Sequence, residues 1–251
     1  MGIILGITGG GGSILTVPIL VYILLLNPVT ATAYSLFIVG TTSVFGAAQN
    51  YFKGLVDFKT GFLFAIPSFT AVYITRKQIV PRIPEAIFEI NDFVLTKGTF
   101  LMVFFALIMI FAAFTMLKKR KKSILKEKKS SLLSLIIQNF IIGVIIGLVG
   151  AGGGFLIIPS LVLFAKLPMK KAIGTSLFII AMNSLIGFMG DVQNLTIDWL
   201  FLLKFTTLSV IGIFIGTYVN KFINEQQLKK GFGYFVLAMA CFILLKEFYF
   251  V

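Results

Sequence analysis

The chain has 251 residues, of which 58% are hydrophobic and only 12% are charged, and its formal net charge is +13. Because a soluble domain carries about 25% charged residues, this composition excludes an ordinary soluble protein and indicates a membrane protein with several spans. Eight of the 22 basic residues lie at positions 118–129, between two apolar runs. Such a cluster is typical of a cytoplasmic loop, so we expect the lipid bilayer, and no nucleic acid, as a partner.

Missing residue types exclude several chemistries. The chain has no histidine, and its one cysteine, Cys241, lies within an apolar segment. These facts exclude a disulfide framework, histidine-dependent metal sites and Ser-His catalysis. The nucleotide-binding pattern G-x-x-x-x-G-K-[ST] does not occur either. We therefore expect a protein that is not an enzyme and that needs no cofactor and no metal.

Apolar segments alternate with short polar ones along the chain. Residues 75–97 are mixed in polarity and predict a loop or a surface helix. The apolar segments predict about eight transmembrane helices, four in each half: residues 1–26, 31–51, 58–74 and 98–117, followed by 132–166, 171–190, 199–219 and 231–249. We expect an all-α polytopic membrane protein with three parts. These are a first transmembrane repeat (1–117), a basic cytoplasmic linker (118–130) and a second transmembrane repeat (131–251).

The two halves match each other at a constant offset of 141 residues. Glycine, leucine and proline positions of residues 9–18 recur over residues 150–159, and Ser35–Ile38 recurs as Ser176–Ile179. A match of this length without a gap indicates an internal duplication, that is, two homologous repeats. We favour eight simple spans, which would make the repeats parallel. A chain that folds back at each glycine run would instead allow inverted repeats.

The first element of the first half is short. Residues 132–149 precede the glycine run of the second half, whereas only residues 1–8 precede that of the first. The first half therefore lacks about ten residues, or nearly three helical turns, of this element. We expect the true start of the protein to lie upstream of Met1.

Each half begins with a helix that is broken by glycines. The first break is Gly9–Gly12, and the second is Gly150–Gly154. Adjacent glycines weaken a helix, and inside a membrane irregular backbone persists only where it is buried in protein or lines a wet cavity. The helix after each break presents free N–H groups and a positive dipole end, which suit an anion. Two such ends meeting near the bilayer midplane predict a transporter's binding site.

The candidate substrate-binding residues are the break glycines, the following serine, polar residues of the second spans and one intramembrane lysine. They are Gly9, Gly10, Gly11, Gly12, Ser13, Gly150, Gly152, Gly153, Gly154, Ser35, Thr42, Ser43, Ser176, Asn183, Ser184 and Lys204. Hydroxyl and amide groups can complete the shell of an oxyanion, and an intramembrane lysine is a functional candidate. Pro18 and Pro159 are candidates for shaping the following helix. Asp57 and Asp198 are expected to cap the third spans.

These residues also have structural interpretations. Glycines can serve close helix packing, which is the favoured interpretation of Gly2, Gly6, Gly143 and Gly147 because of their small-xxx-small spacing. The hydroxyl and amide side chains can instead hydrogen-bond between helices. Lys204 can extend its amine to the membrane surface.

Two glycine breaks, each followed by a proline and a Ser-Leu-Phe-Ile segment, resemble the TauE/SafE sulfite-exporter-like family. The matching stretches are Gly9–Pro18 with Ala31–Ser43, and Gly150–Pro159 with Ala172–Ser184. The resemblance implies a bacterial inner-membrane permease for small sulfur-containing anions such as sulfite or organosulfonates. The family pattern falls on the glycines and prolines of the two breaks.

Together, these observations predict a secondary transporter that exports a small sulfur-containing anion by alternating access. A passive anion channel would use the same site without alternating gates. A non-transporting membrane scaffold would use the glycines for packing alone. Saturation and trans-stimulation of the flux distinguish a transporter from a channel.

Overall fold

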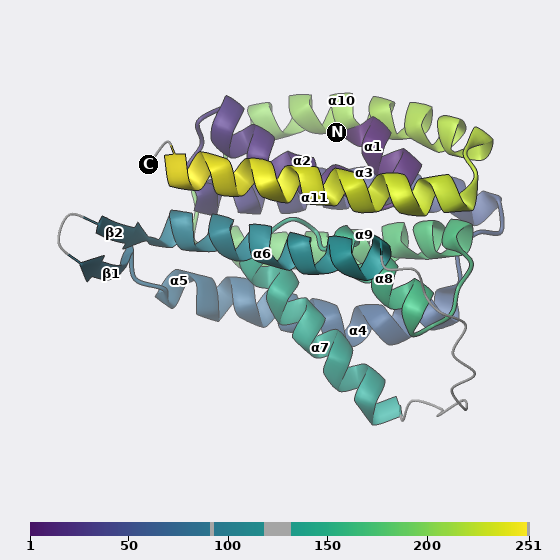
Figure 1. The fold of residues 1–251 in the computed structure, drawn as a ribbon, viewed down its shortest axis with the longest axis horizontal. Helices are drawn as coiled ribbons and strands as arrows, with labels where there is room; N and C mark the ends of the chain where they lie inside the picture. Colours follow the sequence, from purple (N-terminus) through teal and green to yellow (C-terminus); the bar gives the residue numbers. More distant parts are fainter. Residues whose placement is uncertain (91–92, 118–131, 250–251) are drawn as a thin grey trace.

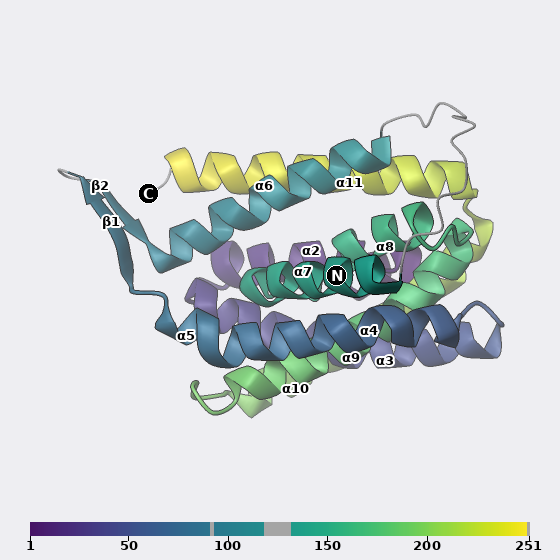
Figure 2. The same cartoon turned by 90° about the horizontal axis from the view of Figure 1, so that it is seen from below.

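The computed structural model describes residues 1–90, 93–117 and 132–249. The basic linker predicted over 118–130 lies outside the described residues. Within them, long helices run side by side along one axis, with two shorter interrupted segments among them and a two-stranded hairpin at one end (Figures 1 and 2).

The long helices are α3 (Pro28–Phe52), α4 (Phe58–Ile74), α6 (Lys97–Leu117), α9 (Met169–Asp191), α10 (Trp199–Val219) and α11 (Glu225–Tyr249). A π-helical turn, η2 (Thr75–Ile79), and a short helix, α5 (Val80–Arg82), continue α4. The 3₁₀ turn η3 (Asn220–Phe222) follows α10. In the described part of the chain, six helices are long and apolar enough to cross a membrane. The prediction of a helical, polytopic membrane protein is therefore confirmed.

The two remaining predicted spans are the glycine-broken segments, and both turn the chain back. The first comprises α1 (Gly2–Thr8), α2 (Gly11–Pro18) and the π-helical turn η1 (Ile19–Ile23). The second comprises α7 (Leu132–Val149) and α8 (Gly154–Leu163). Gly12 lies against Leu5, and Gly153 lies against Ile146, so each break places its second helix back beside the end of its first. These segments are fold-backs and not the simple spans that the apolar runs predict.

Positive φ angles make the reversals possible. Gly9 has φ +72° and Gly150 has φ +67°, a left-handed conformation that ends α1 and α7. Gly152 and Gly153 share it, with φ +67° and +72°. Glycine adopts this region without the steric cost that a side chain would bring.

Over residues 75–97, where a loop or surface helix is predicted, the chain first continues α4 as far as Arg82 and then forms a β-hairpin. Strand β1 (Ala86–Ile90) pairs in antiparallel orientation with β2 (Phe93–Thr96). The sequence contains the reason, since β-branched and aromatic residues flank the dipeptide Asn91-Asp92, a composition typical of hairpins. The mixed polarity of the segment obscures this pattern.

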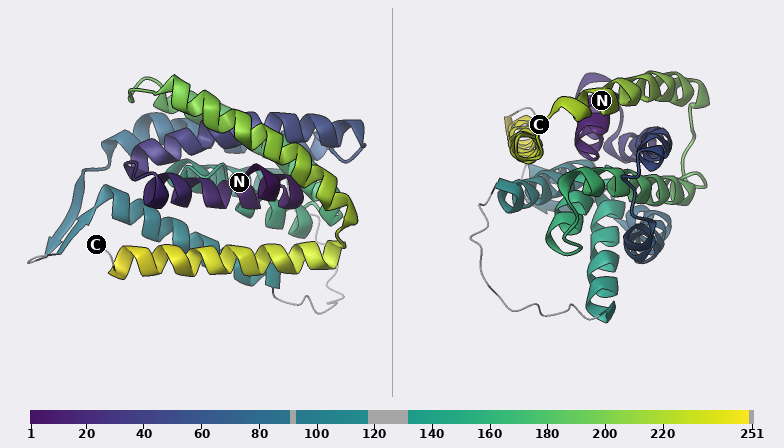
Figure 3. Two further views of the ribbon diagram at one scale, coloured as in Figure 1. Left: turned by 90° about the horizontal axis from the view of Figure 1, so that it is seen from above. Right: turned by 90° about the vertical axis from the view of Figure 1, so that its right-hand side faces the viewer.

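The two ends of the bundle are distinct (Figures 1 and 3). At one, which we call the linker end, α6 ends, α7 begins, and the chain turns from α3 to α4, from α8 to α9 and from α10 to α11. The opposite end carries β1, β2 and the end of α11, and we call it the hairpin end. At the centre α3 and α9 cross in opposite directions, because Gly40 lies against Leu185 whereas Gly46 lies against Leu177.

Glycines bring the first helix of each half against the third span of the other half. Gly2 and Gly6 lie against the backbone of α10, Gly143 lies against the backbone of α4, and Gly147 lies against the Thr75 side chain of η2, which continues α4. A Cβ at any of these positions would meet the facing helix. The close-packing interpretation of these four glycines is therefore confirmed.

Aspartates begin the third spans, as predicted. The carboxylate of Asp57 accepts a hydrogen bond from the backbone N–H of Thr60, at 3.1 Å, and that of Asp198 accepts one from Phe201, at 3.0 Å. These bonds satisfy N–H groups that have no partner within the helix. The N-cap prediction is confirmed for both residues.

Candidate functional site

The two glycine breaks meet in the middle of the bundle. Gly10 and Gly154 lie in direct backbone contact, and a Cβ on Gly10 would lie 2.5 Å from the carbonyl carbon of Gly154. Both glycines are buried. Since α2 begins at Gly11 and α8 at Gly154, the first turns of both helices lie together at this contact. Their first N–H groups have no partner inside their own helix. We call the region the break crossing.

Residues of α9 line one side of the break crossing. The Ser176 hydroxyl donates towards the carbonyl oxygen of Gly9, at 2.9 Å. Ser184 lies between α3 and the second break, with its Cβ against Gly40 and its hydroxyl against Gly152. Two predicted site residues on α9 therefore contact the break glycines directly.

Several donors on α3 and α9, the helices that pack against α2 and α8, are buried without a partner. Among the described residues, eight buried side-chain groups have no hydrogen-bond partner, and four of them belong to predicted site residues: the hydroxyls of Ser35, Ser43 and Ser184 and the Nδ2 of Asn183. The other four belong to Gln49, Thr75, Asn139 and Thr206. An unsatisfied buried polar group costs about 1–3 kcal/mol, so native proteins rarely keep one without a ligand, water or functional reason.

Two predicted site residues join helices of opposite halves. The Thr42 hydroxyl donates to the Ser209 hydroxyl, at 2.9 Å, and the Ser68 hydroxyl donates to Oδ1 of Asn183, also at 2.9 Å. Offsets of 141 residues relate the two pairs. The structural interpretation therefore holds for Thr42, whereas Asn183 uses its oxygen between helices and leaves its amide N–H groups unused.

Lys204 does not belong to the break crossing. Its side chain is exposed on α10, little more than one turn after Trp199. A lysine at this depth reaches the membrane surface with its flexible stem, so we leave it out of the site. The side chain of Ser13 lies outside the described part of the chain. Pro18 ends α2 just before the π-helical turn, and Pro159 lies inside α8.

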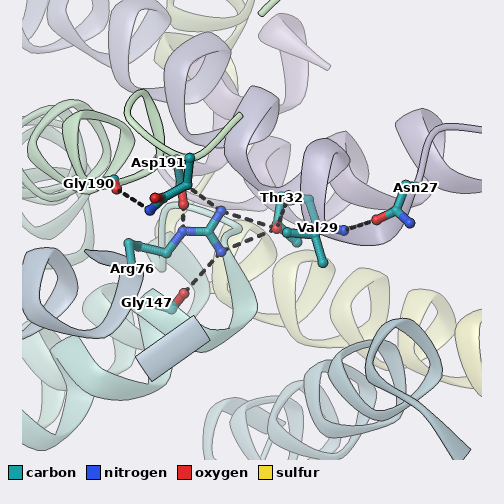
Figure 4. A network of polar contacts seen from close by, with 8 residues as sticks. Asn27, Val29, Thr32, Arg76, Gly147, Gly190 and Asp191 are labelled. Carbon is teal, nitrogen blue, oxygen red and sulfur yellow. Dashed lines mark hydrogen bonds and ion pairs between the residues drawn. The ribbon is translucent and has the colours of Figure 1, made fainter. Parts of the chain in front are cut away.

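The structure contains a buried ion pair that the sequence does not predict. Arg76, which belongs to a segment of predicted loop or surface helix, is fully buried and bonds to Asp191 at 2.7 Å (Figure 4). Both residues fall at the edge of apolar runs, where charges are expected in water. The repeat could have indicated these positions. The 141-residue offset pairs Arg76 with Thr217 and Asp191 with Asn50, so both positions are polar in both halves.

A groove of about 740 Å³ lies between α6, α7 and α8. Gln138 and Ser160 are the polar members of an otherwise apolar lining. Such a surface suits hydrocarbon and does not suit an anion. Gly9, Gly10, Gly12 and the glycines of the second break are buried, as are the unpartnered donors, so the break crossing is occluded in this conformation.

Comparisons with known proteins identify the family. The family model "Sulfite exporter TauE/SafE" matches residues 1–243. A "Probable membrane transporter protein" of Xylella fastidiosa (strain 9a5c) is 26% identical over 251 residues, which cover 97% of this chain and 91% of the relative. "Probable membrane transporter protein YdhB" of Bacillus subtilis (strain 168) is 25% identical over 230 residues, which cover 91% and 90%. No solved structure matches significantly.

The family and the names of these relatives indicate a transporter rather than an enzyme. The six helices of the described ranges that are able to span a membrane agree with that conclusion, and the chain is a multi-pass membrane protein. The chain belongs to the sulfite exporter TauE/SafE family of membrane transporters.

Proposed function

We propose that the protein exports small sulfur-containing anions, such as sulfite or organosulfonates, across the bacterial inner membrane, and that the break crossing is the anion site. The observation that carries the proposal is the meeting of two helix starts at Gly10 and Gly154, packed against α3 and α9, whose buried hydroxyl and amide donors include four without a partner. The N–H groups of the helix starts and the unpartnered hydroxyl and amide groups can all donate hydrogen bonds to the space between them. An oxyanion supplies the acceptors that they lack.

Contacts that recur at the same offset support two inverted repeats. Gly2 packs on Ser209 as Gly143 packs on Ser68, and α3 runs opposite to α9. The corresponding helices α4 and α10 also run in opposite directions, as do α6 and α11 (Figures 1 and 2). In such a fold the two halves can exchange conformations, which opens the central site to one side and then to the other. This exchange is the alternating access that we propose.

Basic residues support a cytoplasmic position for the linker end. Besides the linker, this end carries Lys53, Lys59, Lys166, Lys170, Lys171 and Lys221, on three turns between helices. Cytoplasmic loops carry an excess of lysine and arginine. The hairpin end then faces the periplasm, and export moves the anion from the linker end to the hairpin end.

Anion binding to the purified protein tests the proposal. In detergent, sulfite or methanesulfonate is expected to raise the melting temperature, whereas an amine of similar size is not; a ligand at 100 times its Kd adds about 2.7 kcal/mol. A hydrogen bond to a charged group contributes about 1.5–3 kcal/mol, so Ser184→Ala and Ser43→Ala should each weaken binding about tenfold or more.

The matched control is Ser160→Ala. This serine lies on α8 itself, but its hydroxyl already bonds to the Leu156 carbonyl oxygen at 2.8 Å. We expect its removal to leave anion binding unchanged. A wild-type protein that no anion stabilises would contradict the proposal and favour the non-transporting scaffold, in which the glycines serve packing alone.

A further inference from the structure

Arg76 and Asp191 form a buried ion pair beside the break crossing (Figure 4). The side chain of Arg76 is 0% exposed and that of Asp191 is 5% exposed. Nε of Arg76 donates to Oδ2 of Asp191, at 2.7 Å, and Nη2 lies 2.7 Å from the same oxygen. Removing two charges from water is costly, so the pair persists only because each charge compensates the other.

The guanidinium lies next to the second break. Nη1 and Nη2 both donate to the Thr32 hydroxyl oxygen, at 3.2 Å, and Nη1 donates to the carbonyl oxygen of Gly147, at 3.3 Å (Figure 4). Thr32 in turn lies directly against Gly150. One layer of side chain therefore separates Arg76 from the break glycines. Arg76 lies in η2, so it is on the hairpin side of the second break.

The fold does not need charges at this position. At the positions that the 141-residue offset makes equivalent, Asn50 bonds to the Gly46 carbonyl oxygen and Thr217 bonds to the Ile213 carbonyl oxygen, both at 2.8 Å. Each of these neutral side chains therefore makes its hydrogen bond within its own helix. The same helix contact is thus made with charges on the hairpin side and without charges on the linker side.

We propose that Arg76 binds the charge of the transported anion and that Asp191 is its resident counter-ion, which releases the guanidinium on taking up a proton. The inference deepens the proposed function and rests on it. Anion and carboxylate compete for the same donors, and the planar guanidinium matches an oxyanion as well as it matches a carboxylate. Protonation of Asp191 removes the competitor, so anion and proton bind together.

Among the described residues around the pair, Asp191 is the acidic group, and the proposal assigns the proton to it. Arg76, Tyr73 and Lys77 come from α4 and η2, and Lys77 is exposed and bonds to the Tyr73 hydroxyl at 3.2 Å. From α3 the pair meets the Thr32 hydroxyl, and from α7 it meets the Gly147 carbonyl oxygen. The proton comes from solvent and returns to it. A monovalent anion that crosses with one proton moves no net charge, so export then follows the combined concentration gradients of anion and proton and does not depend on the membrane potential.

Sulfite binding by isothermal titration calorimetry tests the inference. At one fixed pH, Asp191→Asn should bind sulfite about tenfold more tightly than the wild type, because the competing charge is gone, whereas Arg76→Gln should bind about tenfold more weakly. Titrations in buffers of different ionisation enthalpy give the protons taken up per anion. The wild type should take up about one more than Asp191→Asn, a difference that cancels the protonation of sulfite itself.

Lys97→Gln is the matched control. Lys97 is buried near the hairpin end, and its Nζ lies 3.7 Å from the Glu85 carboxylate, but it lies on α6. We expect its binding to equal that of the wild type. If the wild type binds sulfite while Asp191→Asn shows the same affinity and the same proton uptake, the inference is overturned and the proposed function stands. If the wild type binds no sulfite, the proposed function itself fails.

Discussion

Replacing Gly154 with alanine is expected to abolish transport and to lower the free energy of unfolding by about 1–3 kcal/mol or more. The new methyl group would collide with the Cα of Gly10 and lie 2.7 Å from Ile180 Cδ1. Backbone on the opposite side cannot rotate away as a flexible side chain does, so the two helix starts must separate. Chemical or thermal unfolding in detergent measures the loss of stability.

Gly231→Ala provides the control for this clash. Gly231 also lies inside a helix, α11, but nothing lies within 4 Å of the position that its Cβ would occupy. Alanine is favoured over glycine in a helix by up to about 1 kcal/mol, so this variant should be equally or more stable. A Gly154→Ala protein as stable as Gly231→Ala would contradict the backbone contact at the break crossing.

Removing Asp191 is expected to have the largest effect on stability. In Asp191→Ala the guanidinium of Arg76 remains buried without its counter-ion, and breaking a buried pair in this way costs about 3–5 kcal/mol. Asp191→Asn keeps a hydrogen-bond acceptor at the same place and should lose less. Denaturation of the purified variants gives the order, with Asp191→Ala the least stable.

Replacing both partners separates stability from function. Arg76→Met combined with Asp191→Leu removes both buried charges, and such exchanges are often neutral or stabilising by about 1–4 kcal/mol relative to the ion pair. We expect the double variant to recover the stability lost in Asp191→Ala but to bind sulfite about tenfold more weakly than the wild type, as Arg76→Gln does. A double variant that binds sulfite as the wild type does would show that the pair serves the fold alone.

Much of this architecture could be predicted from the sequence because hydropathy and the repeat report on local features. Apolar length defines the long helices, and the small-xxx-small spacing of Gly2 and Gly6 already indicates a close helix contact. Asp57 and Asp198 precede their helices at the positions where a cap is needed. Each of these features depends on a few neighbouring residues.

The fold-back of the broken helices could not be predicted in the same way. A straight span and a reversal at Gly150–Gly154 have the same hydropathy, and the choice depends on tertiary contacts such as Gly153 against Ile146. The burial of Arg76 could not be predicted for a related reason. A helix assigned by hydropathy ends at Ile74, whereas the observed helix continues through η2 to Arg82. This continuation places the Arg76 guanidinium in the protein interior. Its partner lies 115 residues away.

Efflux of radiolabelled sulfite from proteoliposomes tests the central claim most directly. The account predicts a flux that saturates with internal sulfite, rises when unlabelled sulfite is added outside, and falls at least tenfold in Ser43→Ala with Ser184→Ala but not in Ser160→Ala. A flux that grows linearly with concentration, or that the serine variants leave unchanged, would contradict an alternating-access anion site at the break crossing.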